Sequence, residues 1–470
     1  MNAASSPSLS RPALFPTRKI VHMSMLGFAF LLPFLTWLEA VGAAVLALLF
    51  NVFLLPRLEV DLSKRPVRTS GIAGDASGQA ADFDQILTGT WTGIVLYPIS
   101  VLALILIFRH RMYIAAAAWA IMALGDGMAS VAGGAFGGPA LPYNREKTWA
   151  GFGGFIVAGT AGAYVLTRWV APSLASKQVL AVCVATAVAG ALVESVPMRL
   201  DDNLSVPLAS GCFMFSAYLV ERSALASNLP YLGRRLALAA VINLAFALLA
   251  LRFKTINRSG AAVGFLLGVL VYLGWGWKSF ALLLAFFLLG SVSTRLGYRQ
   301  KLKRGIAERR GGARSWREAL ANGLAPAFFS VLVLTTHQEA AFLLALVASL
   351  AEAAGDTVSS EIGEWLSPRA YLLTTFKPVA AGENGGVSLA GTAAGLAASA
   401  MVVGLGYALG LCRAGFASAA FALAAAVAGN LFDSLLGATL ERRTLVTNGI
   451  VNFAGTSFAG ALALVWMLGR

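Results

Sequence analysis

The sequence predicts an all-α, polytopic membrane protein. Its 470 residues are 58% hydrophobic and only 12% charged, and the mean hydropathy is +0.75. Soluble globular proteins do not have this composition. Apolar runs of roughly 17–22 residues recur along the chain, and each is long enough to cross about 30 Å of hydrocarbon. The alternation that marks a membrane β-strand of roughly ten residues does not occur in these runs. We expect roughly 13–15 transmembrane helices in two related halves.

The net charge of +14 comes from Lys and Arg residues in the short loops between apolar runs. This placement follows the positive-inside rule and favours contact with anionic lipid over contact with nucleic acid. The three cysteines stand alone in apolar runs, so they form neither a disulfide framework nor a zinc pattern. Three histidines in the whole chain argue against a histidine–metal site. The expected partner is the lipid bilayer, and the sequence carries no signal for an oligomeric state.

The first half begins with a Ser/Pro-rich segment, 1–17, that we expect to be disordered. Arg18 and Lys19 then precede an apolar run at 20–38. A second run follows at once, so the pattern indicates an uncleaved span rather than a signal peptide. A polar loop outside the hydrocarbon is expected at 57–88. The remaining spans of this half are expected at 40–55, 90–108, 112–125, 150–170, 178–196 and 206–220.

The stretch from Gly125 to Gly154 combines polar residues with many glycines between two of these spans. Asp126 places a carboxylate at membrane depth, which is costly and by default marks a functional site. Lys147 offers a positive charge to phosphate, and glycines let backbone amides approach an anion closely. A Gly-rich surface for helix packing is the alternative, and it explains the glycines but neither Asp126 nor Lys147. The residues of the expected phosphate-and-metal site are Asp126, Lys147, Thr148, Gly151, Gly153 and Gly154.

Three further carboxylates, Glu194, Asp201 and Asp202, lie at or near the ends of later spans. Carboxylates grouped at one membrane face can share a Mg²⁺ ion, which typically takes one or two protein carboxylates together with nucleotide phosphate oxygens. For Asp201 and Asp202 the alternative is an ordinary solvated loop. His22, at the head of the first span, is either an interfacial residue without a role or a phosphate contact.

A break at 223–235 (SALASNLPYLGRR) separates two expected membrane domains, 18–225 and 236–470. Small, polar and basic residues with a proline are typical of a linker. The loop at 295–317 is the most basic in the chain, and the positive-inside rule places it in the cytoplasm. Spans after the break are expected at 236–252, 259–275, 278–293, 324–336 and 339–354.

The second half repeats the plan of the first. Gly355-Asp356 corresponds to Gly125-Asp126, the glycines at 382–391 correspond to those at 151–154, and Asp433 corresponds to the late acidic element. Such a weak internal repeat indicates one site plan that is used twice. The alternative is chance similarity in a chain rich in glycine and alanine.

Three ordered motifs resemble the dolichol kinase and phytol kinase family, and together they cover roughly residues 15–220. They are GDGMAS…GGAFG…KTWAGFGG within 125–154, RKIVH at 18–22, and Glu194 followed by DDNLSVP at 201–207. Members of that family are membrane enzymes that phosphorylate a long-chain isoprenoid alcohol with a nucleoside triphosphate, usually CTP.

This resemblance implies a role for each matching residue. Asp126, together with Asp201, Asp202 or Glu194, would hold Mg²⁺ on the nucleotide, and one of the aspartates would accept the hydroxyl proton. Lys147 and the amides of the glycines would bind phosphate. The remaining residues of the motifs with an implied contact are Arg18, Lys19, His22 and Asn203.

Five motifs of the second half resemble the family of plant phytyl-phosphate kinase, over roughly residues 250–470. They are NRSGA at 257–261, ANG at 321–323, ExxGDTxSSEIG at 352–363, GGVSxxG at 385–391 and DSLLGAT at 433–439. That family consists of integral membrane proteins held to add the second phosphate to an isoprenyl monophosphate. It usually has G-T-x-G-G where this chain has glutamate, Glu383, in place of the threonine.

The second resemblance implies a second site with its own metal and phosphate contacts. Asp356, Glu361 and Asp433 would be the metal ligands, with catalytic roles for the two aspartates. The implied phosphate contacts are Lys377, Gly385, Gly386 and Ser388. Asn430, Asn448 and Asn452 lie in apolar runs, where they either complete the site or hydrogen-bond between helices.

Together the halves resemble two consecutive kinases fused in one chain. The first would convert a prenol such as phytol to its monophosphate and the second would make the diphosphate, with Mg²⁺ and with CTP, ATP or UTP as donor. We expect a multi-pass protein of a bacterial inner membrane, with both nucleotide sites on the cytoplasmic side. A cytidylyltransferase that forms a CDP-lipid is an alternative, although neither half has the Lys-Arg pair expected after its serine. A transporter with inverted or parallel repeats is the non-enzymatic alternative.

Overall fold

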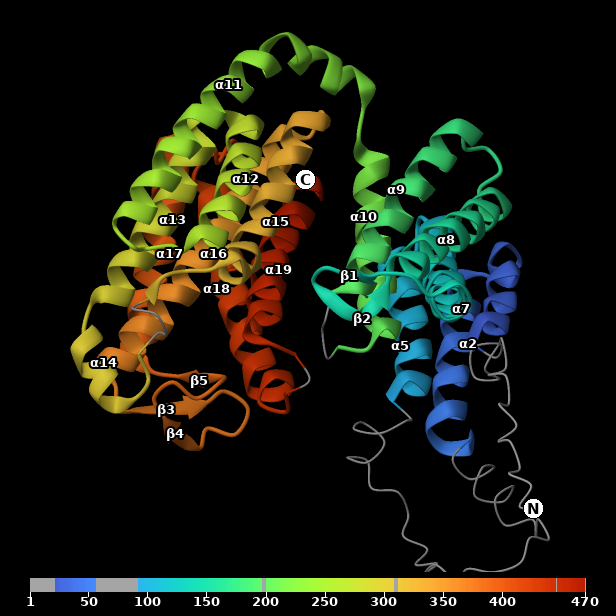
Figure 1. Cartoon of the computed structure of the whole chain (residues 1–470), viewed down its shortest axis with the longest axis horizontal. Helices are drawn as coiled ribbons and strands as arrows, with labels where there is room; N and C mark the ends of the chain where they lie inside the picture. The colour runs from blue at the N-terminus through green and yellow to red at the C-terminus, as the bar shows by residue number, and fades with distance from the viewer. Residues whose placement is uncertain (1–21, 56–91, 197–199, 308–311, 445, 470) are drawn as a thin grey trace, which may run out of the picture. The chain divides into compact units, whose positions relative to one another are not determined.

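The computed structural model describes residues 22–55, 92–196, 200–307, 312–444 and 446–469 (Figure 1). Within these ranges, 12 helices are long and apolar enough to cross a membrane, and two shorter apolar helices occur at His22–Phe34 and Gly93–Ile107. The prediction of a polytopic, all-α membrane fold is confirmed. The disorder expected at 1–17, the polar loop at 57–88 and the contacts predicted for Arg18 and Lys19 fall outside the described residues.

The chain divides into two compact units, unit 1 at Met1–Tyr218 and unit 2 at Leu219–Arg470. The break expected at 223–235 is instead part of one continuous helix, α11, at Arg222–Arg252. Alanine and leucine, which are strong helix formers, are frequent in this segment. Pro230 lies inside the helix without ending it, as prolines often do in membrane helices.

Unit 1 is a helical bundle with one small β-hairpin, drawn from blue to green in Figure 1. Its 3₁₀- and π-helical segments are η1 (Met25–Phe34), η2 (Phe50–Leu54) and η3 (Ile121–Gly125). Its α-helices are α2 (Trp37–Leu49), α5 (Thr92–Ile107), α6 (Met112–Ala120), α7 (Asp126–Phe136), α8 (Trp149–Val170), α9 (Ser176–Ser195) and α10 (Asp202–Leu219). The hairpin pairs β1 (Ala140–Leu141) with β2 (Asn144–Thr148) in antiparallel register.

The core of unit 1 is the continuous helical span Met112–Phe136, formed by α6, η3 and α7, and 78% of the residues in its 18-residue apolar window are buried. Its residues from Ile114 to Ala123 are nearly all inaccessible, and most of them are alanine. Small side chains let neighbouring helices approach closely in a membrane bundle, where packing supplies much of the stability. Helix α8 lies against this span and also contacts α9. Asp126 is therefore presented from the most enclosed helix of the unit.

Unit 2 has the same kind of centre, and its elements run from green to red in Figure 1. Its helices are α11 (Arg222–Arg252), α12 (Arg258–Trp275), α13 (Trp277–Arg295), α14 (Tyr298–Arg304), α15 (Trp316–Thr335), α16 (Glu339–Leu366), α17 (Leu389–Ala408), α18 (Phe416–Leu436), η5 (Gly437–Glu441) and α19 (Asn448–Leu468). A three-stranded antiparallel sheet has the order β4 (Pro378–Ala380), β3 (Arg369–Leu372), β5 (Gly386–Val387). Helix α16 is surrounded by α13, α15, α17, α18 and α19, and 83% of the residues in its 18-residue apolar window are buried.

The two central helices meet the next helix of their unit in the same way. In unit 1 the helix after the hairpin, α8, starts at the cap Thr148, and a Cβ at Gly151 would lie 2.9 Å from the Ala129 carbonyl oxygen. In unit 2 the helix after the sheet, α17, starts at the cap Ser388, and a Cβ at Gly391 would lie 2.5 Å from the Ser359 carbonyl oxygen. Ala129 and Ser359 each follow their aspartate, Asp126 or Asp356, by three positions. The repeat read from the sequence thus corresponds to a shared packing geometry.

The contact of α17 with α16 gives a test of this packing. A Cβ at Gly395 would lie 2.7 Å from the Gly355 carbonyl oxygen, whereas a Cβ at Gly404 of the same helix meets nothing within 4 Å. We expect Gly395→Ala to destabilise unit 2 by about 1–3 kcal/mol through overpacking. Gly404→Ala is the control and should leave stability unchanged or raise it slightly, because alanine favours helix. Thermal unfolding of the purified protein in detergent measures both, and equal melting temperatures for the two variants would contradict this packing.

Candidate functional site

Three carboxylates of unit 1 converge. Asp126 lies inside the continuous span Met112–Phe136, which was expected to end at 125, and the other two lie at helix ends. Asp126 is the first residue of α7, Glu194 lies in the last turn of α9, and Asp202 is the first residue of α10. One ligand oxygen from each lies within 4.8 Å of those of the other two. In the part of the chain that the structure describes, no other three His, Cys, Asp or Glu residues meet this condition. Oxygen ligands at this spacing fit Mg²⁺.

Lys147 reaches this group from β2. Its ammonium donates a hydrogen bond to Glu194 and lies 3.6 Å from Asp202 Oδ2. Burial lowers the pKa of Lys147, but its hydrogen bond with Glu194 opposes this, and the net pKa is raised. Burial raises the pKa of Asp202 to about 7, although Lys147 pulls it down. The hairpin is fixed to the end of α9 because Asn144 Nδ2 donates to the Ser195 carbonyl at 2.9 Å.

His22 completes the surroundings of Asp126. Its Nε2 lies 3.8 Å from Asp126 Oδ2, and its ring makes an edge contact with Tyr97 at 4.8 Å between centroids. The Tyr97 hydroxyl in turn accepts a hydrogen bond from Trp119 Nε1 at 2.6 Å. The structure therefore brings together five residues that the sequence singled out in separate motifs. They are His22, Asp126, Lys147, Glu194 and Asp202.

Asp201 and Asn203 are placed differently from their neighbour Asp202. Asp201 Oδ1 accepts a hydrogen bond from the Asn203 backbone N–H at 2.9 Å, and its carbonyl accepts from Leu204 and Ser205. Asn203 Nδ2 donates to the Gly93 carbonyl at 3.4 Å. These contacts shape the start of α10 and tie it to α5. Asp201, expected to be catalytic, lies outside the group of three carboxylates.

The glycines of the first motif serve helix packing more than phosphate binding, which corrects the prediction. The Gly151 amide, expected to face phosphate, donates to Thr148 Oγ1 at 3.1 Å and so completes the cap of α8. A Cβ at Gly154 would lie 2.6 Å from Ala132 Cβ of α7. Gly153 alone faces open space, with nothing within 4 Å of a Cβ. Close approach of α8 to α7 is the physical reason for Gly151 and Gly154.

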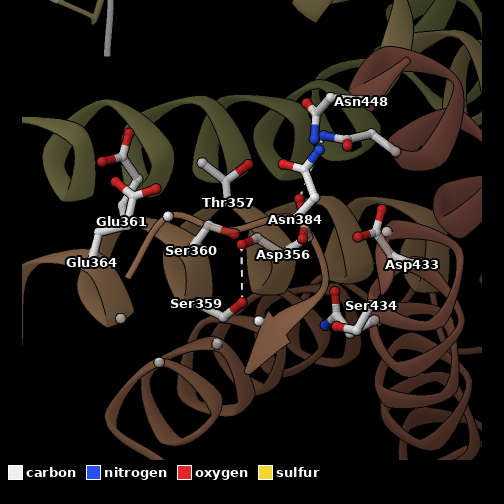
Figure 2. Close-up of a pocket in the computed structure, with 18 of the residues that line it drawn as sticks. Asp356, Thr357, Ser359, Ser360, Glu361, Glu364, Asn384, Asp433, Ser434 and Asn448 are labelled. Atoms are coloured by element: carbon white, nitrogen blue, oxygen red, sulfur yellow. Dashed lines mark hydrogen bonds between the residues drawn. The ribbon is translucent and has the colours of Figure 1, made fainter. Parts of the chain in front are cut away.

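Unit 2 contains a polar cavity of about 910 Å³. Asp356 from α16 and Asp433 from α18 both line it, and Figure 2 shows them with Asn384 lying between Asn448 and Asp356 in this view. The other predicted residues that line the cavity are Glu361, Gly385, Gly386, Ser388, Asn430, Asn448 and Asn452. Two aspartates and several amides around one cavity offer oxygen ligands to a cation and donors to phosphate.

Several of these residues also hold the cavity wall in shape. Gly385 has φ +74°, and a Cβ there would lie 2.2 Å from the Ala438 backbone nitrogen, so only glycine fits this turn against η5. Ser388 Oγ accepts from the Gly391 N–H at 3.2 Å and caps α17. Asn452 Nδ2 donates to Asp356 Oδ2 at 3.4 Å, which links α19 to α16.

Two predictions for unit 2 need correction. Lys377, expected to bind phosphate, is exposed in the turn between β3 and β4 and does not line the cavity. Glu361, expected to bind metal, accepts a hydrogen bond from the buried ammonium of Lys301 on α14. The Lys301 side chain is only 1% exposed and has no open path away from the carboxylate, so Glu361 is a member of a buried ion pair. Lys147 on Glu194 is by contrast 32% exposed. Arg314 and Arg317 are the basic residues that line the cavity in the part of the chain that the structure describes.

Comparison with known proteins identifies the family of the second half of the chain. Residues 241–460 match the family described as integral membrane protein DUF92. A protein of Synechocystis sp. described as an uncharacterized membrane protein is 35% identical over 215 residues, which are 45% of this chain and 82% of that protein. The chain belongs to the DUF92 family of integral membrane proteins.

Two other relatives of this DUF92 member come from plants. Protein VTE6, chloroplastic, from Arabidopsis thaliana is 34% identical over 217 residues, 45% of this chain and 65% of that protein. A probable phytol kinase, chloroplastic, from Triticum aestivum is 34% identical over 134 residues, 27% of this chain and 44% of its own length. The match thus spans less than half of that kinase. These relatives confirm the family resemblance that the motifs indicated. The chain matches no solved structure.

Sequence reasoning missed four residues of the DUF92 unit, Lys301, Arg314, Arg317 and Glu352. Lys301 is one of several basic residues in the loop at 295–317, and nothing in the sequence of that loop indicates which lysine has a buried side chain. Arg314 and Arg317 belong to the same loop. Glu352 was visible as the first letter of the 352–363 motif, a carboxylate within an apolar span, and that position was the available signal.

The ion pair between Lys301 and Glu361 gives a test of its structural role. The side chains are only 1% and 8% exposed, so Lys301→Met leaves a buried carboxylate unpaired and should cost about 3–5 kcal/mol. The double variant Lys301→Met/Glu361→Met should recover most of this loss, because an apolar pair of similar volume often substitutes for a buried ion pair. Lys303→Met, at an exposed position of the same helix, is the control. Thermal unfolding measures all three, and a double variant no more stable than Lys301→Met would contradict the assignment.

Proposed function

We propose that this chain is a membrane isoprenoid kinase with two phosphoryl-transfer sites. Unit 1 phosphorylates a prenol such as phytol, and unit 2 phosphorylates the resulting prenyl monophosphate to the diphosphate. The observation that carries the proposal is the group formed by Asp126, Glu194 and Asp202 with Lys147, gathered in one place in unit 1. Phosphoryl transfer requires mainly positioning and neutralisation of charge, which such a group supplies.

In unit 1, Asp126, Glu194 and Asp202 would hold Mg²⁺, and a bound Mg²⁺ neutralises charge on the nucleotide phosphates. Lys147 would move from the carboxylates to the phosphates, since both are anions that its ammonium can pair with. The prenol oxygen would attack the γ-phosphorus while one of the aspartates accepts the hydroxyl proton, the bond to the bridging oxygen would break, and the nucleoside diphosphate would leave. His22, 3.8 Å from Asp126, is placed beside this reaction.

In unit 2, the cavity of about 910 Å³ is large enough for a nucleotide and a phosphorylated head group together. Asp356 and Asp433 would hold Mg²⁺, with the amides of Asn448 and Asn452 nearby. Arg314 and Arg317 would bind phosphate in place of Lys377. Both arginines can make bidentate contacts with phosphate oxygens.

Similarity to a probable phytol kinase supports phytol as the prenol, and similarity of the motifs to CTP-dependent enzymes supports CTP as the donor, with ATP or UTP as substitutes. The prenyl chain would stay in the bilayer between the two steps. The basic residues at 295–317 support a cytoplasmic position for the nucleotide sites, in a bacterial inner membrane.

In the test, the purified protein in lipid micelles is incubated with Mg²⁺ and with CTP that is labelled at the α- or the γ-phosphate. Either phytol or phytyl monophosphate is added as the acceptor. Wild type should transfer only the γ-label and should make diphosphate from phytol. Asp126→Asn should lower monophosphate formation at least about 100-fold yet still convert the monophosphate, because it removes charge stabilisation at one site only. Asp356→Asn should stall at the monophosphate.

Two exposed or distant carboxylates serve as controls. Glu146→Gln changes the exposed neighbour of Lys147, and Glu339→Gln changes the start of α16, so neither should alter either step. Transfer of the α-label would favour a cytidylyltransferase. If neither label reaches any prenyl lipid with CTP, ATP or UTP, the kinase proposal fails and transport becomes the better explanation.

A further inference from the structure

Glu352 is a fully buried carboxylate to which the proposed reaction gives no role. It lies on α16 one helical turn before Asp356, and the residue is 1% exposed. Neither of its carboxylate oxygens receives a hydrogen bond from any described residue. Buried charges in proteins are paired or coordinate a metal, because an isolated charge in an apolar interior is very costly. The position therefore calls for a partner that a protein side chain does not supply.

Two glycines make the space that the Glu352 side chain fills. A Cβ at Gly429 of α18 would lie 2.7 Å from Glu352 Cγ, and a Cβ at Gly455 of α19 would lie 2.4 Å from Glu352 Oε1. The same Cβ at Gly455 would lie 3.3 Å from Asp433 Cβ. The carboxylate of Glu352 is thus directed at the junction of α18 and α19, next to Asp433.

Other oxygens at this junction also have no hydrogen-bond partner. Among the described residues of unit 2, the buried side-chain atoms in this condition are Glu352 Oε1 and Oε2, Asn430 Oδ1, Asp433 Oδ2 and Asn452 Oδ1. All five are oxygens, and they come from α16, α18 and α19. Asn452 uses its nitrogen to donate to Asp356 Oδ2 at 3.4 Å, which leaves its oxygen for another partner. Such a set of acceptors without donors fits a bound cation.

We propose that Glu352, Asp433, Asn430 and Asn452 form an oxygen-only binding site for a divalent cation beside the cavity of unit 2. Carboxylate and amide oxygens are the ligands that hard cations such as Mg²⁺ and Mn²⁺ prefer. Asn430 and Asp433 lie three residues apart on α18, so both side chains share one helix face. Asp433, Asn430 and Asn452 also line the cavity, which gives the cation access to a phosphate bound there.

The two units differ at this position. The residue one turn before Asp126 is Met122, which is buried and apolar, where unit 2 has Glu352 before Asp356. The additional carboxylate of unit 2 therefore comes from its central helix. The role of the cation in phosphoryl transfer rests on the proposed function. Binding of the cation itself requires neither nucleotide nor phosphoryl transfer.

The test counts Mn²⁺ ions bound to the full chain in detergent without nucleotide, from the electron paramagnetic resonance signal of free Mn²⁺. Wild type should bind two ions, one among Asp126, Glu194 and Asp202 and one at Glu352 and Asp433, since the Mg²⁺ proposed at Asp356 enters with the nucleotide. The Asp126→Asn variant should bind one ion, since unit 1 loses its site. In the Asp126→Asn background, Glu352→Gln keeps the side-chain shape and should weaken the remaining site at least about 10-fold. Glu364→Gln, on the same helix and at the edge of the cavity, is the matched control and should bind as tightly as its parent.

Two results would overturn the proposal. One is unchanged Mn²⁺ affinity in the Glu352→Gln variant, which would make Glu352 a neutral carboxylic acid. The other is a wild-type protein that binds a single ion, together with an Asp126→Asn variant that binds none. This second comparison needs no substitution in unit 2, so it does not depend on the folding of Glu352→Gln. Intact cation binding in a protein without kinase activity would instead reject the proposed function and leave this site standing.

Discussion

Both units depend on one constraint, the cost of holding carboxylates at the depth of a membrane. An unpaired ion in an apolar interior costs several kcal/mol even after relaxation, so each buried carboxylate requires a partner. Unit 1 meets this requirement with Lys147, which binds Glu194 and approaches Asp202. Unit 2 meets it at Glu361 with Lys301 but leaves Glu352 without a donor among the described residues. The difference distinguishes carboxylates that are paired with a lysine from Glu352, for which we propose a cation as the partner.

Small residues make these arrangements possible, because they let the helices that carry the carboxylates come together. Gly151 and Gly391 allow a capped helix to touch the backbone of the central helix just beyond Asp126 and Asp356. Gly429 and Gly455 leave space for the side chain of Glu352 between α18 and α19. Glycine in a transmembrane helix thus has two functions here, close helix packing and space for a polar side chain, and only the second is specific to a site.

The sequence predicted the membrane fold, because hydropathy alone determines which segments can cross a bilayer. It also predicted that Asp126, Glu194 and Asp202 gather, although Asp126 lies inside the span Met112–Phe136 and not at the span end that the sequence indicated. It did not predict the pairing of Lys301 with Glu361, which depends on the direction of one side chain in a basic loop. The role of Gly151 was ambiguous for a related reason: a glycine that packs and a glycine that binds phosphate look alike in sequence. The linker expected at 223–235 is instead part of helix α11, because polar residues do not end a helix that has strong helix formers around them.

The account rests on two nucleotide–metal sites, one in each unit. Its most direct test is a cryo-electron microscopy map of the full chain with Mg²⁺ and a non-hydrolysable CTP analogue. We predict density for a cation among Asp126, Glu194 and Asp202, with Lys147 turned onto the phosphates, and a second nucleotide in the cavity lined by Asp356 and Asp433. A map in which Lys147 stays on Glu194, and in which neither unit holds nucleotide at saturating concentration, would contradict it.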